Sequence, residues 1–121
     1  MKILGLDHIQ IAMPVGEEAL ARSYYGELLG LIEVDKPINL ASRGGVWFEN
    51  GGLKVHLGVD AQFVPAKKAH PGFRVVDLDS ISKQLQAHGF NVEDAKQIPG
   101  FRRIFTVDPF GNKIEFLEAE E

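Results

Sequence analysis

The chain has 121 residues, which is enough for one domain with a real core but too few for two independent domains. Its net charge is −4 and its lysines and arginines are scattered, so neither a nucleic-acid-binding surface nor a nucleic-acid partner is expected. The absence of cysteine excludes disulfides, thiolate metal ligands and a cysteine nucleophile. Residues 1–6 are too short an apolar run for a signal peptide and no stretch is long enough to span a membrane, so we expect a cytoplasmic protein with no membrane partner.

The first predicted element is a strand. Residues 6–13 alternate strictly, with Ile9 and Ile11 on one face and His8 and Gln10 on the other. Pro14 ends this pattern. The strand therefore carries a histidine on its polar face.

A helix is predicted to follow, over residues 17–29. Two glutamates open it, where the helix dipole favours acidic side chains, and Gly30 ends it. Leu20, Tyr24 and Leu28, with an alanine beside them, recur at helical spacing. We expect this stripe to face the core.

Three strands and a connector complete the first half. The strands are predicted at 31–34, 45–48 and 53–57, and the last of them carries His56. Residues 58–68 are polar, with one proline and no sustained period, which is typical of a connector.

The pattern then starts again. Residues 70–75 match residues 8–13 at an offset of 62. The remaining predicted elements are a helix that carries Ile81 and Leu85, is capped by Asp77 or Asp79 and ends at Gly89, followed by strands at 90–92, 102–107 and 113–117.

The two halves are also in register at their last strands. Residues 52–57 match residues 111–116 at an offset of 59, so that Glu115 falls on His56. In both halves 26 residues separate the helix-ending glycine from this position. Such self-similarity indicates an internal duplication.

We therefore predict an α+β fold in which two βαβββ modules form a cupped mixed sheet within a single domain, 1–121. Module one would cover about 4–58 and module two about 69–118, with the connector 58–68 between them.

A turn rich in special residues introduces the last strand. In residues 108–112, Asp-Pro-Phe-Gly-Asn, proline presets one backbone angle, Gly111 supplies a positive φ, and the Asp and Asn side chains bond the local backbone. The strand that follows alternates charged and apolar residues, with Glu115 between two core positions.

Four residues of metal-ligating type occupy equivalent positions of the repeat. They are His8, His56, His70 and Glu115. Their neighbours in the strands are apolar, so if the apolar faces pack on the helices, all four point to the opposite face. A histidine or glutamate alone is weak evidence, but a complete set at equivalent points predicts a metal site. His88, at a helix end, is interpreted as an ordinary surface histidine.

The segments 6–11, 70–75 and 108–115 resemble those of the vicinal oxygen chelate superfamily, which includes glyoxalase I, fosfomycin-resistance proteins, methylmalonyl-CoA epimerase, extradiol dioxygenases and bleomycin-resistance proteins. The resemblance covers essentially the whole chain, and the Asp-Pro-x-Gly-Asn-x-x-Glu run is its most specific part. It implies paired βαβββ modules that hold a divalent metal.

By position, the resemblance implies that His8, His70 and Glu115 are the usual ligands and His56 the more variable fourth. Glyoxalase I usually has a carboxylate or an amide in place of His56, and fosfomycin enzymes typically have a hydroxyl residue in place of Gln10. Three imidazoles and a carboxylate suit Zn, Ni, Mn, Co or Fe, and the donor set does not distinguish these metals.

The resemblance favours a metal-dependent, glyoxalase I-like lyase or isomerase acting on a small α-oxo or vicinal-oxygen compound. The metal would chelate two adjacent oxygens and stabilise an enediolate-like state, while Glu115 or His56 relays the proton. Two alternatives remain open: a non-catalytic small-molecule binder like the bleomycin-resistance proteins, and a small ring-cleaving dioxygenase.

Further expectations concern the substrate and the assembly. Arginines on or near the predicted face indicate an anionic small-molecule substrate. The predicted substrate contacts are Gln10, Trp47, Arg74, Arg102 and Arg103. Short members of the superfamily often pair modules between chains, so we expect a homodimer with shared sites.

Overall fold

The computed structural model of the chain describes residues 1–120. The chain forms two compact units, Met1–Phe63 and Val64–Glu121. The division between the units falls inside the predicted connector, residues 58–68. Within residues 1–120, no helix is both long and apolar enough to cross a membrane.

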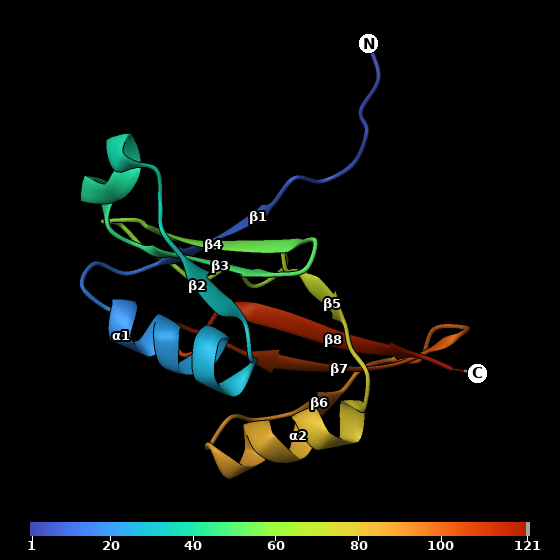
Figure 1. Cartoon of the computed structure of the whole chain (residues 1–121). Helices are drawn as coiled ribbons and strands as arrows, with labels where there is room; N and C mark the ends of the chain where they lie inside the picture. Colours follow the sequence, from blue (N-terminus) through green and yellow to red (C-terminus); the bar gives the residue numbers. More distant parts are fainter. Residues whose placement is uncertain (121) are drawn as a thin grey trace. The chain divides into compact units, whose positions relative to one another are not determined.

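Unit 1 is a four-stranded sheet with a helical segment between its first two strands (Figure 1). Its elements are β1 (Ile9–Met13), α1 (Glu18–Ala21), η1 (Arg22–Leu28), β2 (Ile32–Val34), η2 (Ile38–Arg43), β3 (Val46–Asn50) and β4 (Leu53–Val59). The strand order is β1-β4-β3-β2, with β1 parallel to β4 and the other neighbours antiparallel. The helical segment η1 contacts β2 and β3.

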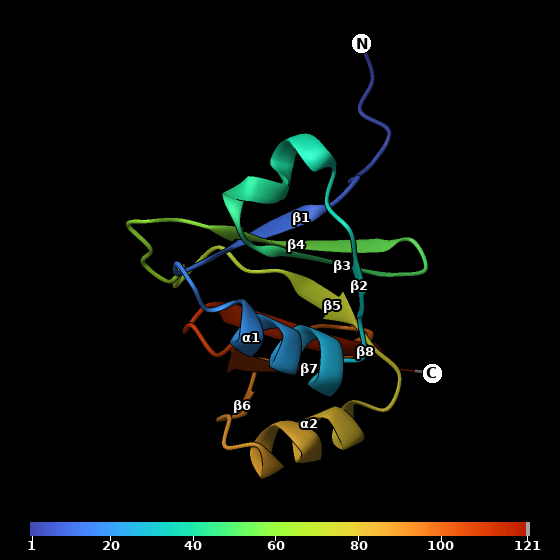
Figure 2. The same cartoon turned by 60° about the vertical axis from the view of Figure 1, so that its left-hand side comes forward.

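Unit 2 repeats this arrangement. Its elements are β5 (Gly72–Arg74), α2 (Leu78–Ala87), β6 (Glu93–Asp94), β7 (Phe101–Val107) and β8 (Lys113–Ala119). The strand order is β5-β8-β7-β6, again with the first strand parallel to the last. The helix α2 runs beside this sheet and contacts β7 and β8 (Figure 2). The predicted α+β fold with two βαβββ modules is confirmed, as two four-stranded mixed sheets.

The helix of unit 1 differs from the prediction in its second half. A four-residue α-helix continues directly into η1, a seven-residue π-helix. The turns of a π-helix are wider than those of an α-helix, so the adjacent Tyr24 and Tyr25 both point inward and are at most 1% exposed. Leu20, which the 3.6-residue period placed in the core stripe, is 45% exposed.

The helix of unit 2 follows the prediction closely. Leu78 and Leu85 are fully buried on one side of α2. The sequence left two capping residues open, and the structure selects Asp77, whose Oδ1 accepts a hydrogen bond from Ser80 N at 3.2 Å. Gly89, with a φ of 86°, ends the helix as predicted.

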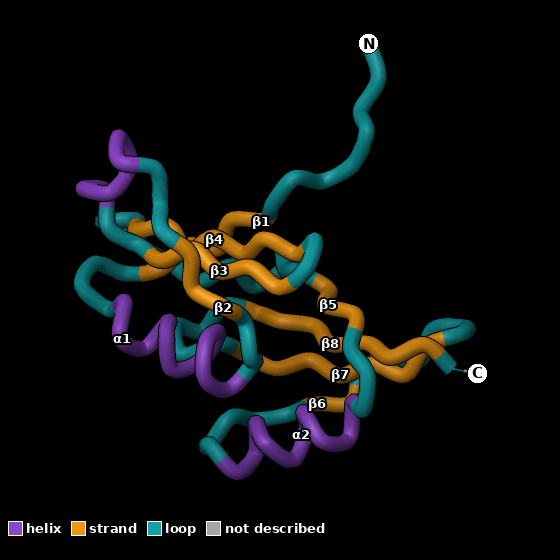
Figure 3. The backbone as a smooth tube through the Cα atoms, in the orientation of Figure 1, coloured by secondary structure: helices purple, strands orange, loops and turns teal. Residues whose placement is uncertain are grey.

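Two predicted strands differ from the observed ones. The first begins at Ile9 rather than at Leu6, because the residues before Ile9 form no ladder with β4 (Figure 3). The strand predicted at 90–92 is absent, and the short β6 follows it instead. The main-chain carbonyl of Asn91 accepts a hydrogen bond from the Thr106 hydroxyl at 2.7 Å, so a side-chain contact takes the place of a ladder bond there.

The predicted turn before β8 is present and tightly bonded. Asp108 Oδ1 accepts hydrogen bonds from the main-chain N–H groups of Phe110 and Asn112, both at 2.9 Å, and Asp108 Oδ2 accepts one from Asn112 Nδ2 at 3.0 Å. Asp108 is only 2% exposed, and Gly111 has a φ of 90°. This turn fixes the start of the strand that carries Glu115.

Candidate metal-binding site

The four predicted ligands lie at equivalent points of the two units. In unit 1, His56 of β4 pairs with the residue two positions after His8. In unit 2, Glu115 of β8 pairs with the residue two positions after His70. Both histidines therefore lie just before the first strand of their unit rather than within it. The repeat gives each unit one pair of candidate ligands.

The pair in unit 1 is a stack of aromatic rings. The His8 and His56 rings are 4.3 Å apart between centroids, and Trp47 lies parallel to His56 with a centroid distance of 3.7 Å. Asp7 Oδ2 lies 2.9 Å from His8 Nδ1, and this hydrogen bond is the main reason that the pKa of the Asp7 carboxyl is lowered. The carboxylate holds Nδ1, so Nε2 is the nitrogen left to bind a ligand.

His56 is the most enclosed member of the set in unit 1. It is only 5% exposed, and neither of its ring nitrogens forms a hydrogen bond with another residue of the described chain. Burial and, secondarily, the charge of nearby His8 lower the pKa of the His56 imidazole, which favours the neutral ring. A neutral imidazole is the form that binds metal.

The pair in unit 2 is in direct contact. His70 Nε2 lies 2.9 Å from Glu115 Oε1, and His70 Nδ1 lies 2.8 Å from the main-chain oxygen of Lys68. Both ring nitrogens thus face oxygen acceptors, whereas a neutral imidazole has only one N–H to donate. The 2.9 Å separation of Nε2 and Oε1 is that of an ordinary hydrogen bond. Two ligand atoms bound at about 2.1 Å at a right angle are also roughly 3.0 Å apart, so the two side chains are close enough to share a metal ion.

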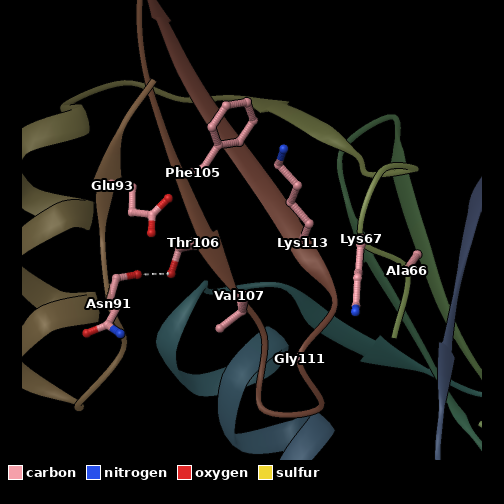
Figure 4. Close-up of a pocket in the computed structure, with 9 residues that line it drawn as sticks. All are labelled: Ala66, Lys67, Asn91, Glu93, Phe105, Thr106, Val107, Gly111 and Lys113. Carbon is pink, nitrogen blue, oxygen red and sulfur yellow. Dashed lines mark hydrogen bonds between the residues drawn. The ribbon is translucent and has the colours of Figure 1, made fainter. Parts of the chain in front are cut away.

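Arg103 and Phe105 surround the same carboxylate. Glu115 is 8% exposed, and Arg103 Nη1 lies 3.4 Å from its Oε2. The Phe105 ring has its centroid 5.4 Å from that of His70, and Lys113 Nζ lies 4.0 Å from the Phe105 centroid. Figure 4 shows the Lys113 side chain reaching toward Phe105. Both residues line a hollow of about 370 Å³. The hollow gives this face of unit 2 room for a small molecule.

The predicted substrate contacts fall into two groups. Gln10 pairs with His56, Arg74 pairs with Leu117 on the Glu115 face, and Arg103 contacts Glu115 itself. Trp47 stacks on His56 and lines a second hollow in unit 1, of about 640 Å³. These four lie near candidate ligands of their own unit.

Arg102 is not brought to the site. Neighbouring residues of a strand face opposite sides, so Arg102 points away from the face that carries Arg103. It is exposed and forms an ion pair with Asp79 of α2 at 2.8 Å. The pairing raises the pKa of Arg102 and lowers that of Asp79.

The sequence analysis missed two of the neighbours that shape the two pairs, namely Asp7 and the main-chain oxygen of Lys68. Asp7 could have been found, because it is adjacent to His8 in the sequence. Phe105 is the unit 2 counterpart of Trp47, since each pairs across the sheet with a candidate ligand. A carbonyl group has no sequence signature.

Within residues 1–120, no group of three or more histidine, aspartate or glutamate side chains is placed to hold a metal ion. Each unit supplies one pair, and the complete four-ligand site remains a prediction.

Two βαβββ units, each with ligand-type side chains at the same two points, define a protein built by duplication of a βαβββ module. The family model of the Glyoxalase/Bleomycin resistance protein/Dioxygenase superfamily matches residues 5–116, and the chain belongs to this superfamily.

Solved structures agree with this assignment. A glyoxalase family protein from Bacillus anthracis is 45% identical, with a TM-score of 0.93 over 99% of this chain and 98% of its own. A glyoxalase/dioxygenase from Nostoc punctiforme is 20% identical, with a TM-score of 0.75 over 100% and 99% of the two chains. The fosfomycin resistance protein FosX from Listeria monocytogenes is 16% identical, with a TM-score of 0.76 over 98% and 96%. The last two likenesses concern the fold alone. A comparison with curated proteins found no match.

Proposed function

We propose that the protein is a metal-dependent lyase or isomerase of the glyoxalase type, acting on a small compound with two adjacent oxygens. His8, His56, His70 and Glu115 would hold one divalent ion, with Zn, Ni, Mn, Co and Fe as candidates. Such an ion, when bound, supplies a Lewis acid that polarises a carbonyl and stabilises the charge of an enediolate.

The observation that carries the proposal is the contact of His70 with Glu115. The Nε2 and Oε1 atoms are 2.9 Å apart while Nδ1 of the same ring already has a carbonyl acceptor, that of Lys68. A carbonyl behind a ligating imidazole fixes its tautomer and aims the other nitrogen at the metal. In unit 1, the Asp7 carboxylate does the same for His8 at 2.9 Å.

The side chains have distinct roles in the proposed reaction. The Glu115 carboxylate is buried beside the proposed metal position. It can take a proton from one carbon of the substrate and return it to the neighbouring carbon. His56 is the alternative proton carrier, since burial keeps its imidazole neutral. Gln10, Trp47 and Arg74 would contact the substrate around the ligands.

We further propose a homodimer in which each site is shared between chains. Each unit holds only half of the ligand set, so two units must pair to complete a site. The connector of 11 residues, 58–68, can span about 35 Å when extended, so its length permits pairing within one chain or between two. Short superfamily members often use the second arrangement, and we propose it for this chain.

The test is metal binding by purified variants. We expect His8→Ala, His70→Ala and Glu115→Ala each to lose bound metal, and His56→Ala to weaken binding less if it is the variable ligand. His88→Ala is the matched control: His88 is exposed, its Nδ1 lies 2.8 Å from Gln84 O, and its loss should leave metal content unchanged. Unchanged metal content in the Glu115 variant would rule out the proposed ligand set.

A second outcome separates the enzyme from a binder. Wild-type protein that retains no divalent metal after exposure to Zn, Ni, Mn and Fe would contradict the proposal. A non-catalytic small-molecule-binding protein would then be the better description.

A further inference from the structure

We infer that the substrate is a small 2-oxo or 2-hydroxy carboxylate, with its negative charge at the end that chelates the metal, and that Arg103 binds this carboxylate beside Glu115. The inference rests on the proposed function and specifies its substrate class. A neutral α-oxo compound, or one whose charge lies on a distant tail, would not satisfy the groups described below.

Among the described residues, the Arg103 guanidinium has protein partners at Nε and Nη1 but not at Nη2. Its Nε donates to the main-chain oxygen of Lys96 at 2.8 Å, and its Nη1 lies 3.4 Å from Glu115 Oε2. Its guanidinium carbon is 5.3 Å from the Phe105 ring centroid, and the side chain is 17% exposed.

The remaining donors of Arg103 have no partner in the described chain. A guanidinium has five N–H groups in a rigid fork, and Nη2 forms no hydrogen bond with residues 1–120. The Arg103 side chain is only 17% exposed, and largely buried polar groups are nearly always paired. A substrate carboxylate fits the fork in a bidentate manner, and it would be one atom away from an oxygen that chelates the metal.

The net charge of the sheet face that carries Glu115 is positive, which also favours an anionic ligand. Residues paired directly across the sheet point to the same side, which places Arg74, Arg103 and Lys113 with Glu93 and Glu115 on one face of unit 2. Three cations and two carboxylates leave one positive charge in excess, and a divalent ion would raise the excess to three. An anionic ligand would offset part of this charge, whereas a neutral ligand would not.

A hollow on the same face offers space for the uncharged part of the substrate. Its volume of about 370 Å³ lies at the low end of ligand pockets, which range from about 300 to 1,000 Å³. Arg103 and Glu115 do not line it, whereas Phe105 forms an apolar wall and Lys113 a cationic rim (Figure 4).

Arg102 provides a matched control for Arg103. The two residues are adjacent and carry the same charge, but Arg102 faces the other side of the sheet and pairs with Asp79. Replacing either arginine by glutamine removes one positive charge, so a difference between the two variants reports on position and not on net charge.

The experiment is calorimetric binding of oxalate, a chelating dicarboxylate, and of neutral 2,3-butanedione to the zinc-loaded protein. We expect wild type to bind oxalate and to bind butanedione at least about tenfold more weakly. Arg103→Gln should weaken oxalate binding about ten- to a hundredfold, the usual loss for a charge-assisted hydrogen bond, while Arg102→Gln should change it less than about twofold. Arg103→Lys, which keeps the charge without the fork, should fall between. Retained zinc, measured after gel filtration, shows that the loss is not one of metal.

Equal oxalate affinity in the two glutamine variants, or equal affinity of wild type for the two probes, would overturn the inference while leaving the metal site intact. If wild type takes up no zinc, the proposed function fails separately. The carboxylate site at Arg103 can then be tested by titrating acetate into the metal-free protein and following the NMR signal of the Arg103 Nε–H. A saturable shift supports a carboxylate site at Arg103, and an unchanged signal refutes it. An unchanged urea-unfolding midpoint of Arg103→Gln, or a loss of oxalate affinity in the conservative Arg103→Lys variant, shows that the result does not reflect a folding defect.

Discussion

Asp108→Ala should destabilise the protein strongly, because one carboxylate holds the whole turn before β8. It accepts three hydrogen bonds, from Phe110 N, Asn112 N and Asn112 Nδ2, and is 2% exposed. Removing it leaves three donors to find new partners, and each buried unpaired donor costs about 1–3 kcal/mol. Partial access to water will lower the sum, so we expect the free energy of unfolding to fall by about 3 kcal/mol or more.

The assay is urea unfolding followed by circular dichroism, with Asp79→Ala as the control. Asp79 is an exposed aspartate whose partner is the exposed Arg102, and exposed ion pairs contribute little to stability. Its removal should leave the unfolding midpoint essentially unchanged. A loss below about 1 kcal/mol for Asp108→Ala would show that water replaces the carboxylate in the turn, and the reasoning from buried donors would be refuted.

Two other predictions concern acid stability and assembly. Glu18 accepts a hydrogen bond from Gly45 N at 2.9 Å, which is the main reason that its pKa is lowered from 4.5. A carboxyl whose pKa is lowered in the folded state contributes stability above about pH 4.5, and this stability is lost as the pH falls through the folded-state pKa. The stability advantage of wild type over Glu18→Gln should therefore shrink in acid. A difference between their urea midpoints that stays constant from pH 7 to pH 3 would contradict this prediction. For the shared-site dimer, His8→Ala and Glu115→Ala chains refolded together should regain metal in about one quarter of all sites, because half of the dimers are mixed and each has one intact site. Metal analysis of the refolded mixture checks this, and no recovery, or a monomer by sedimentation, would reject sharing.

Much of the fold could be predicted because the duplication left its pattern in the chain. The sequence aligned His56 with Glu115, and the structure places them at equivalent points. His56 lies in β4 beside β1, and Glu115 lies in β8 beside β5. The alternation around Glu115 also predicted its buried neighbours, Ile114 and Phe116. Period and repeat are properties of the sequence itself, so they survive without coordinates.

The features that the sequence did not predict depend on tertiary contacts. A 3.6-residue period cannot anticipate the π-helix that buries Tyr24 and Tyr25 together. In the sequence, Arg102 and Arg103 form one basic pair. In β7 their side chains point to opposite faces of the sheet, where Arg102 contacts Asp79 and Arg103 contacts Glu115. The acceptor behind His70 is a main-chain carbonyl, which every residue has.

The stack of Trp47 on His56 provides an intrinsic fluorescent probe of unit 1. The chain contains a single tryptophan and two tyrosines, so emission excited at wavelengths too long for tyrosine to absorb comes from this one indole. The ring lies parallel to the imidazole at 3.7 Å, close enough for any change in the electronic state of His56, through a proton or a bound cation, to alter the brightness of the indole. Unit 2 has phenylalanine at the equivalent place, which is silent at these wavelengths. Fluorescence therefore follows events at His56, and at His8 stacked on it, with no label attached.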